Sequence, residues 1–325
     1  MRPFAFSRAT DAHDATATVG TKGQFIAGGT TLIDLMKLNV MSSPNLVDIN
    51  RIGLNTVEES GSIVKIGALV SNTDLAHNEI VLREFPVLSQ ALLSGASVQL
   101  RNMATVGGNI LQRTRCYYFR DTALPCNKRD PGSGCPAIEG YNRIHAVLGT
   151  SDQCVATHPS DMCVALVMLD TTINVSGPSG DRKILFADFH KLPENTPNIE
   201  SVLQPGELIV SIEISKSDLA KNSSYLKVRD RHSFAFALTS AAVALKVSGG
   251  VISQARIGLG GVATKPWRAK EAEEALVGKP PNRDSFKAAA NKALEAAKPL
   301  KHNGFKIELA RRTLVRALEQ VGARG

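Results

Sequence analysis

Four cysteines in one irregular stretch are the residues of this chain best suited to redox or metal chemistry. They are Cys116, Cys126, Cys135 and Cys154, separated by nine, eight and eighteen residues. Four thiolates on a flexible backbone can bind an iron–sulfur cluster or a zinc ion. Structural zinc sites usually contain cysteine pairs roughly two to four residues apart, and the sequence has no such pair. The spacing therefore favours an iron–sulfur cluster, with a zinc ion and unligated thiols as the alternatives.

The segment around these cysteines is basic and has no apolar periodicity from about Arg113 to Gln153. A loop of this length inside a compact domain is usually functional. Its cations, which would stabilise an anionic cluster and raise its reduction potential, are Arg113, Arg115, Arg120, Lys128 and Arg129. The fifth cysteine, Cys163, lies in an apolar helical pattern and is expected to be a small core residue.

Two segments with paired glycines are candidates for binding a diphosphate. In "FIAGGTTLIDLM" a strand leads through Gly28 and Gly29 into a helix that Thr31 is expected to cap. Bare backbone amides at such a turn suit a pyrophosphate, although an ordinary strand-to-helix turn has the same pattern. A second glycine turn is expected at Gly107 and Gly108 in "LRNMATVGGNILQ". The two turns would hold opposite ends of one diphosphate, and neither matches the GxGxxG or P-loop motifs.

Two further polar segments have a structural and a functional interpretation. Ser160 and Asp161 in "THPSDM" begin an apolar helix, so a helix cap explains them, and Asp161 would also accept a hydrogen bond from a ribityl or flavin group. His158 is expected to be a packed loop residue. In "YLKVRDR", a basic face formed by alternate residues of a strand would be an exposed edge or would face an anionic cofactor; it contains Lys227, Arg229 and Arg231.

Length and composition indicate a two-domain globular protein. The 325 residues are 43% hydrophobic, enough for a sizeable core, and the net charge of +8 is spread along the chain. Only 5% of the residues are aromatic, which is few for a nucleic-acid stacking surface. The sequence has no run of eighteen apolar residues and begins without an apolar signal region. We therefore expect no membrane span and folding in the cytoplasm, where clustered thiols suggest metal binding.

The expected elements mix helices and strands, with a domain boundary near residues 217–223. Strands are expected at 24–29, 45–50 and 208–214, and hairpins at 56–70 and 171–186. Helices are expected at 30–40, 71–81, 85–97, 158–170, 268–278, 283–298 and 304–321. The segments 233–247 and 251–263 are expected to be two strands, or one helix and one strand.

Taken in order, "FIAGGTTLIDLM", "LRNMATVGGNI", "HPSD" and "KVRDR" followed by "SFAFA" resemble the FAD-binding medium subunit of the molybdenum hydroxylases. This family includes xanthine dehydrogenase, carbon monoxide dehydrogenase and aldehyde oxidoreductases. The likeness covers nearly the whole chain. The four-cysteine segment is similar to the loop that holds a [4Fe–4S] cluster in the FAD subunit of bacterial periplasmic aldehyde oxidoreductases. Hydroxybenzoyl-CoA reductase has a similar inserted cluster.

The resemblance implies an α+β fold in two domains. The first is a two-subdomain FAD-binding domain of the PCMH/vanillyl-alcohol-oxidase type over 1–218, with subdomains at about 1–55 and 56–218 and the iron–sulfur loop at 113–156. The second is a smaller α+β domain of the molybdenum hydroxylase flavoprotein type over 222–325.

The resemblance also implies the site residues. Cys116, Cys126, Cys135 and Cys154 match the cluster ligands. The residues that would contact FAD are Ile26, Ala27, Gly28, Gly29, Thr30, Thr31, Leu32, Ile33, Thr105, Gly108, Asn109, Ser160, Asp161 and Lys227.

The implied function is electron transfer from [2Fe–2S] clusters of a small partner subunit to FAD and on to an external acceptor such as a ferredoxin. A large partner subunit would oxidise an aldehyde at a molybdenum cofactor, giving a heterotrimer. Any export to the periplasm would occur together with a partner, and the final compartment stays open. No membrane or nucleic-acid partner is expected. Arg113, Arg115 and Lys128 are predicted to dock the acidic acceptor. The alternatives are the flavoprotein subunit of a hydroxybenzoyl-CoA reductase-like enzyme, and a zinc-stabilised basic module that binds nucleic acid.

Overall fold

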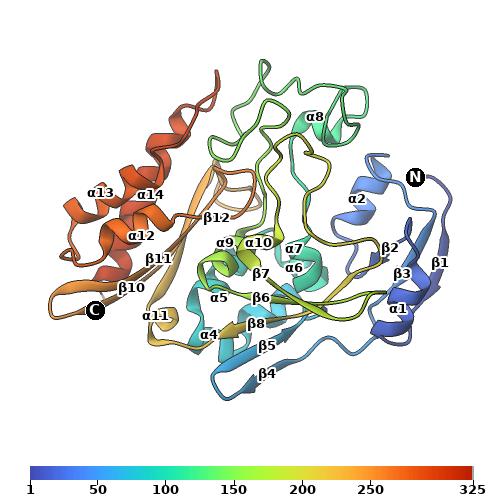
Figure 1. The fold of residues 1–325 in the computed structure, drawn as a ribbon, viewed down its shortest axis with the longest axis horizontal. Coiled ribbons are helices and arrows are strands. Elements are labelled where there is room, and N and C mark those ends of the chain that lie inside the picture. The colour runs from blue at the N-terminus through green and yellow to red at the C-terminus, as the bar shows by residue number, and fades with distance from the viewer. Residues whose placement is uncertain (324–325) are drawn as a thin grey trace.

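A computed structural model describes residues 1–323, which form three β-sheets with helices packed against them (Figure 1). The first sheet contains β1 (Ala5–Arg8), β2 (Gln24–Ile26) and β3 (Asn45–Asp48) in the order β1-β3-β2. Both strand pairs are parallel. Parallel neighbours need crossover connections, and these contain the helices α1 (Ala12–Val19) and α2 (Leu32–Lys37).

The second sheet has five strands, all antiparallel to their neighbours. Its order is β4-β5-β8-β6-β7, formed by β4 (Val57–Ser60), β5 (Ile63–Gly67), β6 (Thr172–Ser176), β7 (Arg182–Leu185) and β8 (Leu208–Ser215). The central strand β8 therefore comes from a part of the sequence far from β5. The two expected hairpins and the expected strand at 208–214 are confirmed.

A large apolar core lies between this sheet and a group of short helices. These helices are α3 (Asn72–His77), α4 (Glu79–Glu84), α5 (Pro86–Ser94), α7 (Val106–Ile110), α9 (Asp161–Met168), α10 (Phe186–Phe189) and α11 (Asp218–Lys221). Helix α6 (Val98–Met103) follows α5 and contains no buried residue. Every residue of α9 is buried, as expected for a helix that is apolar all round. It contacts both α5 and the strands of the third sheet, so it joins the two halves of the molecule.

The third sheet is antiparallel with the order β12-β11-β10-β9. Its strands are β9 (Ser223–Val228), β10 (Thr239–Ser248), β11 (Val251–Gly260) and β12 (Trp267–Arg268). The three expected C-terminal helices, α12 (Lys270–Leu276), α13 (Arg283–Ala293) and α14 (Phe305–Gly322), lie together beside this sheet (Figure 1). They share an apolar core with β10 and β11.

The segment between α7 and α9 contains a single helix, α8 (Tyr117–Arg120). It extends above the sheets as long loops (Figure 1), as the lack of periodicity predicted. Among residues 1–323, no helix is both long enough and apolar enough to span a membrane.

Three local expectations are wrong. Gly107 and Gly108 lie inside the short helix α7, because the Thr105 hydroxyl accepts the Gly108 amide and caps that helix. Thr31 precedes α2 without a side-chain cap. Strand β9 ends at Val228, so Arg229 and Arg231 are not part of a strand face with Lys227.

Candidate cofactor sites

A cavity of about 520 Å³ lies between the first two sheets. Its wall includes residues 23–32 around the first glycine turn, the start of α7, and the β8 residues Leu208 and Ile209. Further wall segments are 110–114, 156–159, 189–191, 200–201 and 203–207. A volume of this order fits a drug-sized ligand or cofactor. We call this space the large cavity.

The first glycine turn has the properties of an anion site. In the described residues 1–323, no hydrogen bond is donated by the backbone amides of Gly28, Gly29, Thr30 or Thr31. Gly29 has a φ of +70°, a conformation that glycine adopts without strain. A Cβ on Gly28 would lie 1.7 Å from the carbonyl oxygen of Met103. The bare Gly28 backbone therefore lets this turn pack against the end of α6, next to Thr105.

Most of the residues predicted to contact FAD lie in the wall of the large cavity. They are Ile26, Ala27, Gly28, Gly29, Thr30, Thr31, Leu32, Thr105 and Gly108. The remaining five, Ile33, Asn109, Ser160, Asp161 and Lys227, are not part of the lining.

The last three of those residues belong to a buried polar group at the start of α9. Asp161 accepts hydrogen bonds from Lys227 Nζ at 2.7 Å and Tyr225 Oη at 2.5 Å. The pKa of Tyr225 is raised well above its usual value by burial and by the Asp161 carboxylate. Ser160 caps α9 by accepting the Cys163 amide and donates to Asn109 Oδ1 at 2.6 Å. This group joins α7, α9 and β9 beside the large cavity.

A partly buried ion cluster forms another part of the cavity wall. Glu200 accepts from Arg113 Nε at 2.5 Å and pairs with Lys128 Nζ at 2.7 Å. Burial raises the pKa of Glu200, but the two cations outweigh burial and the net shift is downward. Lys128 also donates to the Pro197 carbonyl at 2.9 Å, and its side chain is only 11% exposed. Sequence reasoning missed Glu200, because 87 residues separate it from Arg113 and its local sequence has no motif.

The four loop cysteines converge on one small hollow beside the large cavity. All four line this hollow, and all are free thiols. Cys116, Cys126 and Cys154 are 5–7% exposed, and Cys135 is half-buried. We call these four residues the cysteine site.

The surroundings of the cysteine site suit metal-bound thiolates. Backbone amides that stabilise a thiolate contact Cys116, Cys135 and Cys154. His145 Nε2 lies 3.1 Å from the sulfur of Cys116. Burial raises the pKa of Cys116 to about 12 and that of Cys154 to about 11. Without a bound metal these thiols would thus be protonated at neutral pH, whereas coordination stabilises the thiolate.

The spacing of the four sulfurs does not match the ligand set of a single tetrahedral ion. A tetrahedral zinc ion with Zn–S bonds of about 2.3 Å would hold its sulfurs about 3.8 Å apart. Over residues 1–323, the four thiols are not among the groups close enough to hold one ion. A cubane cluster binds each thiolate at a different iron atom and tolerates wider separations. The zinc alternative is therefore less compatible with this geometry.

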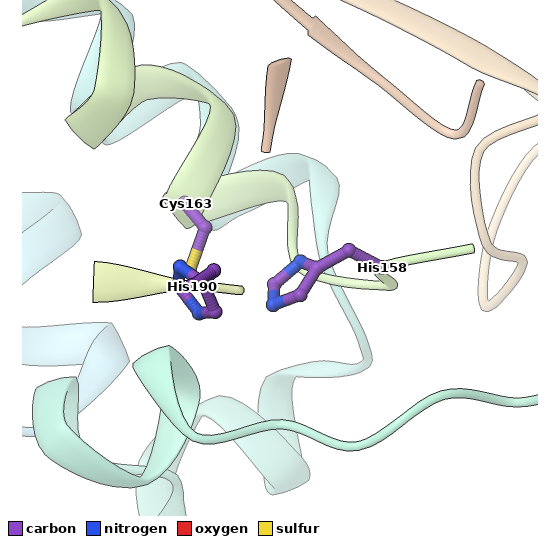
Figure 2. Close-up of side chains that lie close together, drawn as sticks. All are labelled: His158, Cys163 and His190. Carbon is purple, nitrogen blue, oxygen red and sulfur yellow. The ribbon is translucent and has the colours of Figure 1, made fainter. Parts of the chain in front are cut away.

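Residues 1–323 contain one group of three close metal-type ligands, namely His158, Cys163 and His190, whose ligand atoms lie within 4.8 Å of one another (Figure 2). His190 Nε2 lies 3.1 Å from the Ile110 carbonyl, so this nitrogen donates and Nδ1 carries the lone pair. His158 Nδ1 accepts the Ser160 amide at 3.4 Å, so its Nε2 carries the proton.

The nitrogens His158 Nε2 and His190 Nδ1 are buried without a partner among the described residues. His158 Nε2 is therefore a hydrogen-bond donor and His190 Nδ1 an acceptor, whereas a metal ion would need a lone pair from each nitrogen. Burial lowers the pKa of His190 to about 4 and that of His158 well below its usual value, so both rings are neutral. This arrangement suits a hydroxyl group or a water molecule better than a metal ion. Cys163 is buried, as expected for a core residue, and His158 is partly buried in the cavity wall. Their proximity to His190 had no sequence signal.

The predicted docking role of the loop cations conflicts with their contacts. Arg113 and Lys128 are 20% and 11% exposed and pair with Glu200. Arg115 is 24% exposed and pairs with Asp34 of α2 at 3.1 Å. Arg120 binds the same carboxylate at 2.6 Å. These cations hold the loop to the rest of the domain and present little free charge to a partner.

Comparisons with known proteins agree with this arrangement. The chain matches the family model "FAD binding domain in molybdopterin dehydrogenase" over residues 2–216. It matches "CO dehydrogenase flavoprotein C-terminal domain" over residues 224–321. These matches define an oxidoreductase subunit with an FAD-binding domain. The chain belongs to the FAD-binding medium subunits of the molybdenum hydroxylase family.

Individual relatives cover almost the whole chain. The chain is 48% identical to the aldehyde oxidoreductase FAD-binding subunit PaoB of Escherichia coli K12, with 99% of each chain covered. It is 32% identical to the glyceraldehyde dehydrogenase medium chain of Sulfolobus acidocaldarius, over 91% of this chain and 89% of that one. A reconstituted CO dehydrogenase structure from Oligotropha carboxidovorans matches with a TM-score of 0.78 and 25% identity, over 100% and 99% of the two chains.

Proposed function

We propose that this chain is the electron-transfer subunit of a molybdenum-dependent aldehyde oxidoreductase, with FAD in the large cavity and a [4Fe–4S] cluster at the cysteine site. The observation that carries the proposal is the convergence of Cys116, Cys126, Cys135 and Cys154 next to the cavity of an FAD-binding domain. The 48% identity to an aldehyde oxidoreductase FAD-binding subunit supports the aldehyde assignment.

The polar groups in the wall of the large cavity suit a flavin nucleotide. The unpaired amides from Gly28 to Thr31 would hold the diphosphate, because successive backbone N–H groups form an anion site. Thr105 and Gly108 line the same cavity beside this turn and would complete the diphosphate site. FAD would supply the exchange between two-electron and one-electron steps.

The residues of this chain would position the redox groups and exclude water from them. Lys128 and Ala156 line both the large cavity and the cysteine site. The two spaces therefore share part of their wall. Ala156 follows the predicted ligand Cys154 by two residues, so a short stretch of backbone connects the cysteine site to the cavity wall.

Partner subunits would complete the enzyme. We propose a large subunit with the molybdenum cofactor and a small subunit with two [2Fe–2S] clusters, in a heterotrimer whose external acceptor is a ferredoxin. The domains of this chain would divide at 218–222, as predicted from the sequence. The chain would fold in the cytoplasm before any export with a partner.

Anaerobic reduction of the assembled complex tests this function. Benzaldehyde is added to the air-free complex, and the absorbance band of the oxidised flavin is followed over time. We expect the flavin to be reduced within the turnover time of the complex. A complex that oxidises benzaldehyde while its flavin stays oxidised would refute the electron-transfer role.

A further inference from the structure

We infer that Lys128 sets the reduction potential of the cysteine-bound cluster and that Glu200 opposes it, through one partly buried ion pair in the wall shared with the flavin cavity. This inference rests on the proposed cluster and concerns residues that no cofactor motif contains. Lys128 would be a positioning residue that acts through its charge, without binding either cofactor covalently.

The position of Lys128 supports this role. It lies two residues after Cys126 and lines both the cysteine site and the large cavity. Its side chain is 11% exposed, so water screens its charge little. Arg115 and Arg120 belong to the same loop but share the carboxylate of Asp34 on α2, away from this wall.

The charge of Lys128 lies beside the cysteine site. Lys128 lines the same hollow as Cys126 and Cys154, and no bulk water separates this little-exposed side chain from a centre bound there. A cation in such a position favours added negative charge on that centre. Reduction of a cluster adds one electron, so a nearby cation makes reduction easier and raises the potential.

The negative charge of Glu200 opposes the effect of Lys128 on the reduction potential. Its carboxylate pairs with Lys128 at 2.7 Å and with Arg113 at 2.5 Å, so the three groups together carry one net positive charge. Removing Lys128 would leave an Arg113–Glu200 pair with no net charge. Removing the Glu200 charge would leave two cations. The two changes should therefore move the potential in opposite directions.

The test is a redox titration of the assembled complex followed by electron paramagnetic resonance at low temperature. We expect Lys128→Met to shift the [4Fe–4S] potential to a more negative value and Glu200→Gln to shift it to a more positive value. Lys128→Arg keeps the charge and should restore the wild-type potential. Lys292→Met removes an exposed lysine of α13 and should leave the potential unchanged.

Iron and flavin contents separate failure of this inference from failure of the proposed function. If wild-type complex lacks the [4Fe–4S] signal, the proposed function and the inference both fail. If iron, flavin and signal are normal but Lys128→Met and Lys292→Met have the same potential, only the inference fails. If Lys128→Met yields no folded protein, Glu200→Gln decides alone, and a potential that falls or stays constant overturns the inference.

Discussion

The Glu200 ion cluster makes a quantitative prediction about stability. Glu200→Gln keeps the size of the side chain but removes the charge that pairs with Arg113 at 2.5 Å and Lys128 at 2.7 Å. Breaking a buried ion pair by removing one partner costs about 3–5 kcal/mol. Gln retains one carbonyl acceptor, and the Glu200 side chain is 29% exposed toward the cavity. We therefore expect a loss near the lower limit, about 3 kcal/mol.

Thermal unfolding of the purified chain measures this loss. At about 2 °C per kcal/mol for a protein of this size, the melting temperature should fall by about 6 °C. Glu319→Gln is the matched control, because its pair with Arg283 spans 3.3 Å between side chains 37% and 69% exposed. Such a surface pair contributes less than about 1 kcal/mol. Equal melting temperatures for the two variants would refute the assignment of Glu200 to a buried, stabilising cluster.

The lowered pKa of Glu200 predicts how the stability of the protein depends on pH. The pKa of Glu200 is lowered on folding by Lys128 and Arg113, which outweigh the upward effect of burial. A group with a lowered folded-state pKa stabilises the protein above its unfolded-state pKa, and the contribution is lost as the pH falls toward the folded-state value. The stability difference between wild type and Glu200→Gln should therefore be largest at neutral pH and shrink below about pH 4.5. A difference that grows in acid would contradict the lowered pKa.

Two further substitutions test the cavity wall and the polar group beside it. Gly28→Ala places a Cβ 1.7 Å from a backbone carbonyl oxygen of α6 and should sharply lower the flavin content of the purified protein. The control is Gly304→Ala, whose Cβ would have no neighbour nearer than 3.7 Å and which should keep its flavin. Equal flavin contents in the two variants would argue against the glycine turn as the diphosphate site. Lys227→Met leaves the buried Asp161 carboxylate without its cation and should cost about 3–5 kcal/mol of unfolding free energy in a urea titration. Lys292→Met, at an exposed pair, should cost less than about 1 kcal/mol, and similar losses in the two lysine variants would contradict the buried pair.

Much of the fold follows from local sequence patterns. The alternating apolar residues of β4–β5 and β6–β7 and the Ser160 cap of α9 are local signals that survive in the structure. The second glycine pair was misread as a turn because Thr105 provides a helix cap that offsets the low helix propensity of glycine. The segment after Val228 continues the alternating basic pattern, but it leaves the sheet there.

Only part of the cofactor sites could be predicted from local sequence. The glycine turn and the four cysteines are recognisable because each uses unusual residue types within a short or irregular segment. Glu200 and His190 have ordinary local sequences, and only the folded chain brings them to Lys128 and His158. Burial and ion pairing also decide which loop cations face solvent, so charge alone did not show that Arg113 is paired with Glu200.

Iron and flavin analysis of the chain purified without air tests the central claim most directly. If the cysteine site holds a [4Fe–4S] cluster and the large cavity holds FAD, each chain should contain about four iron atoms and one FAD. Cys126→Ser should lose the iron and keep the flavin. Wild-type protein with stoichiometric zinc in place of iron, or with neither iron nor flavin, would contradict the account.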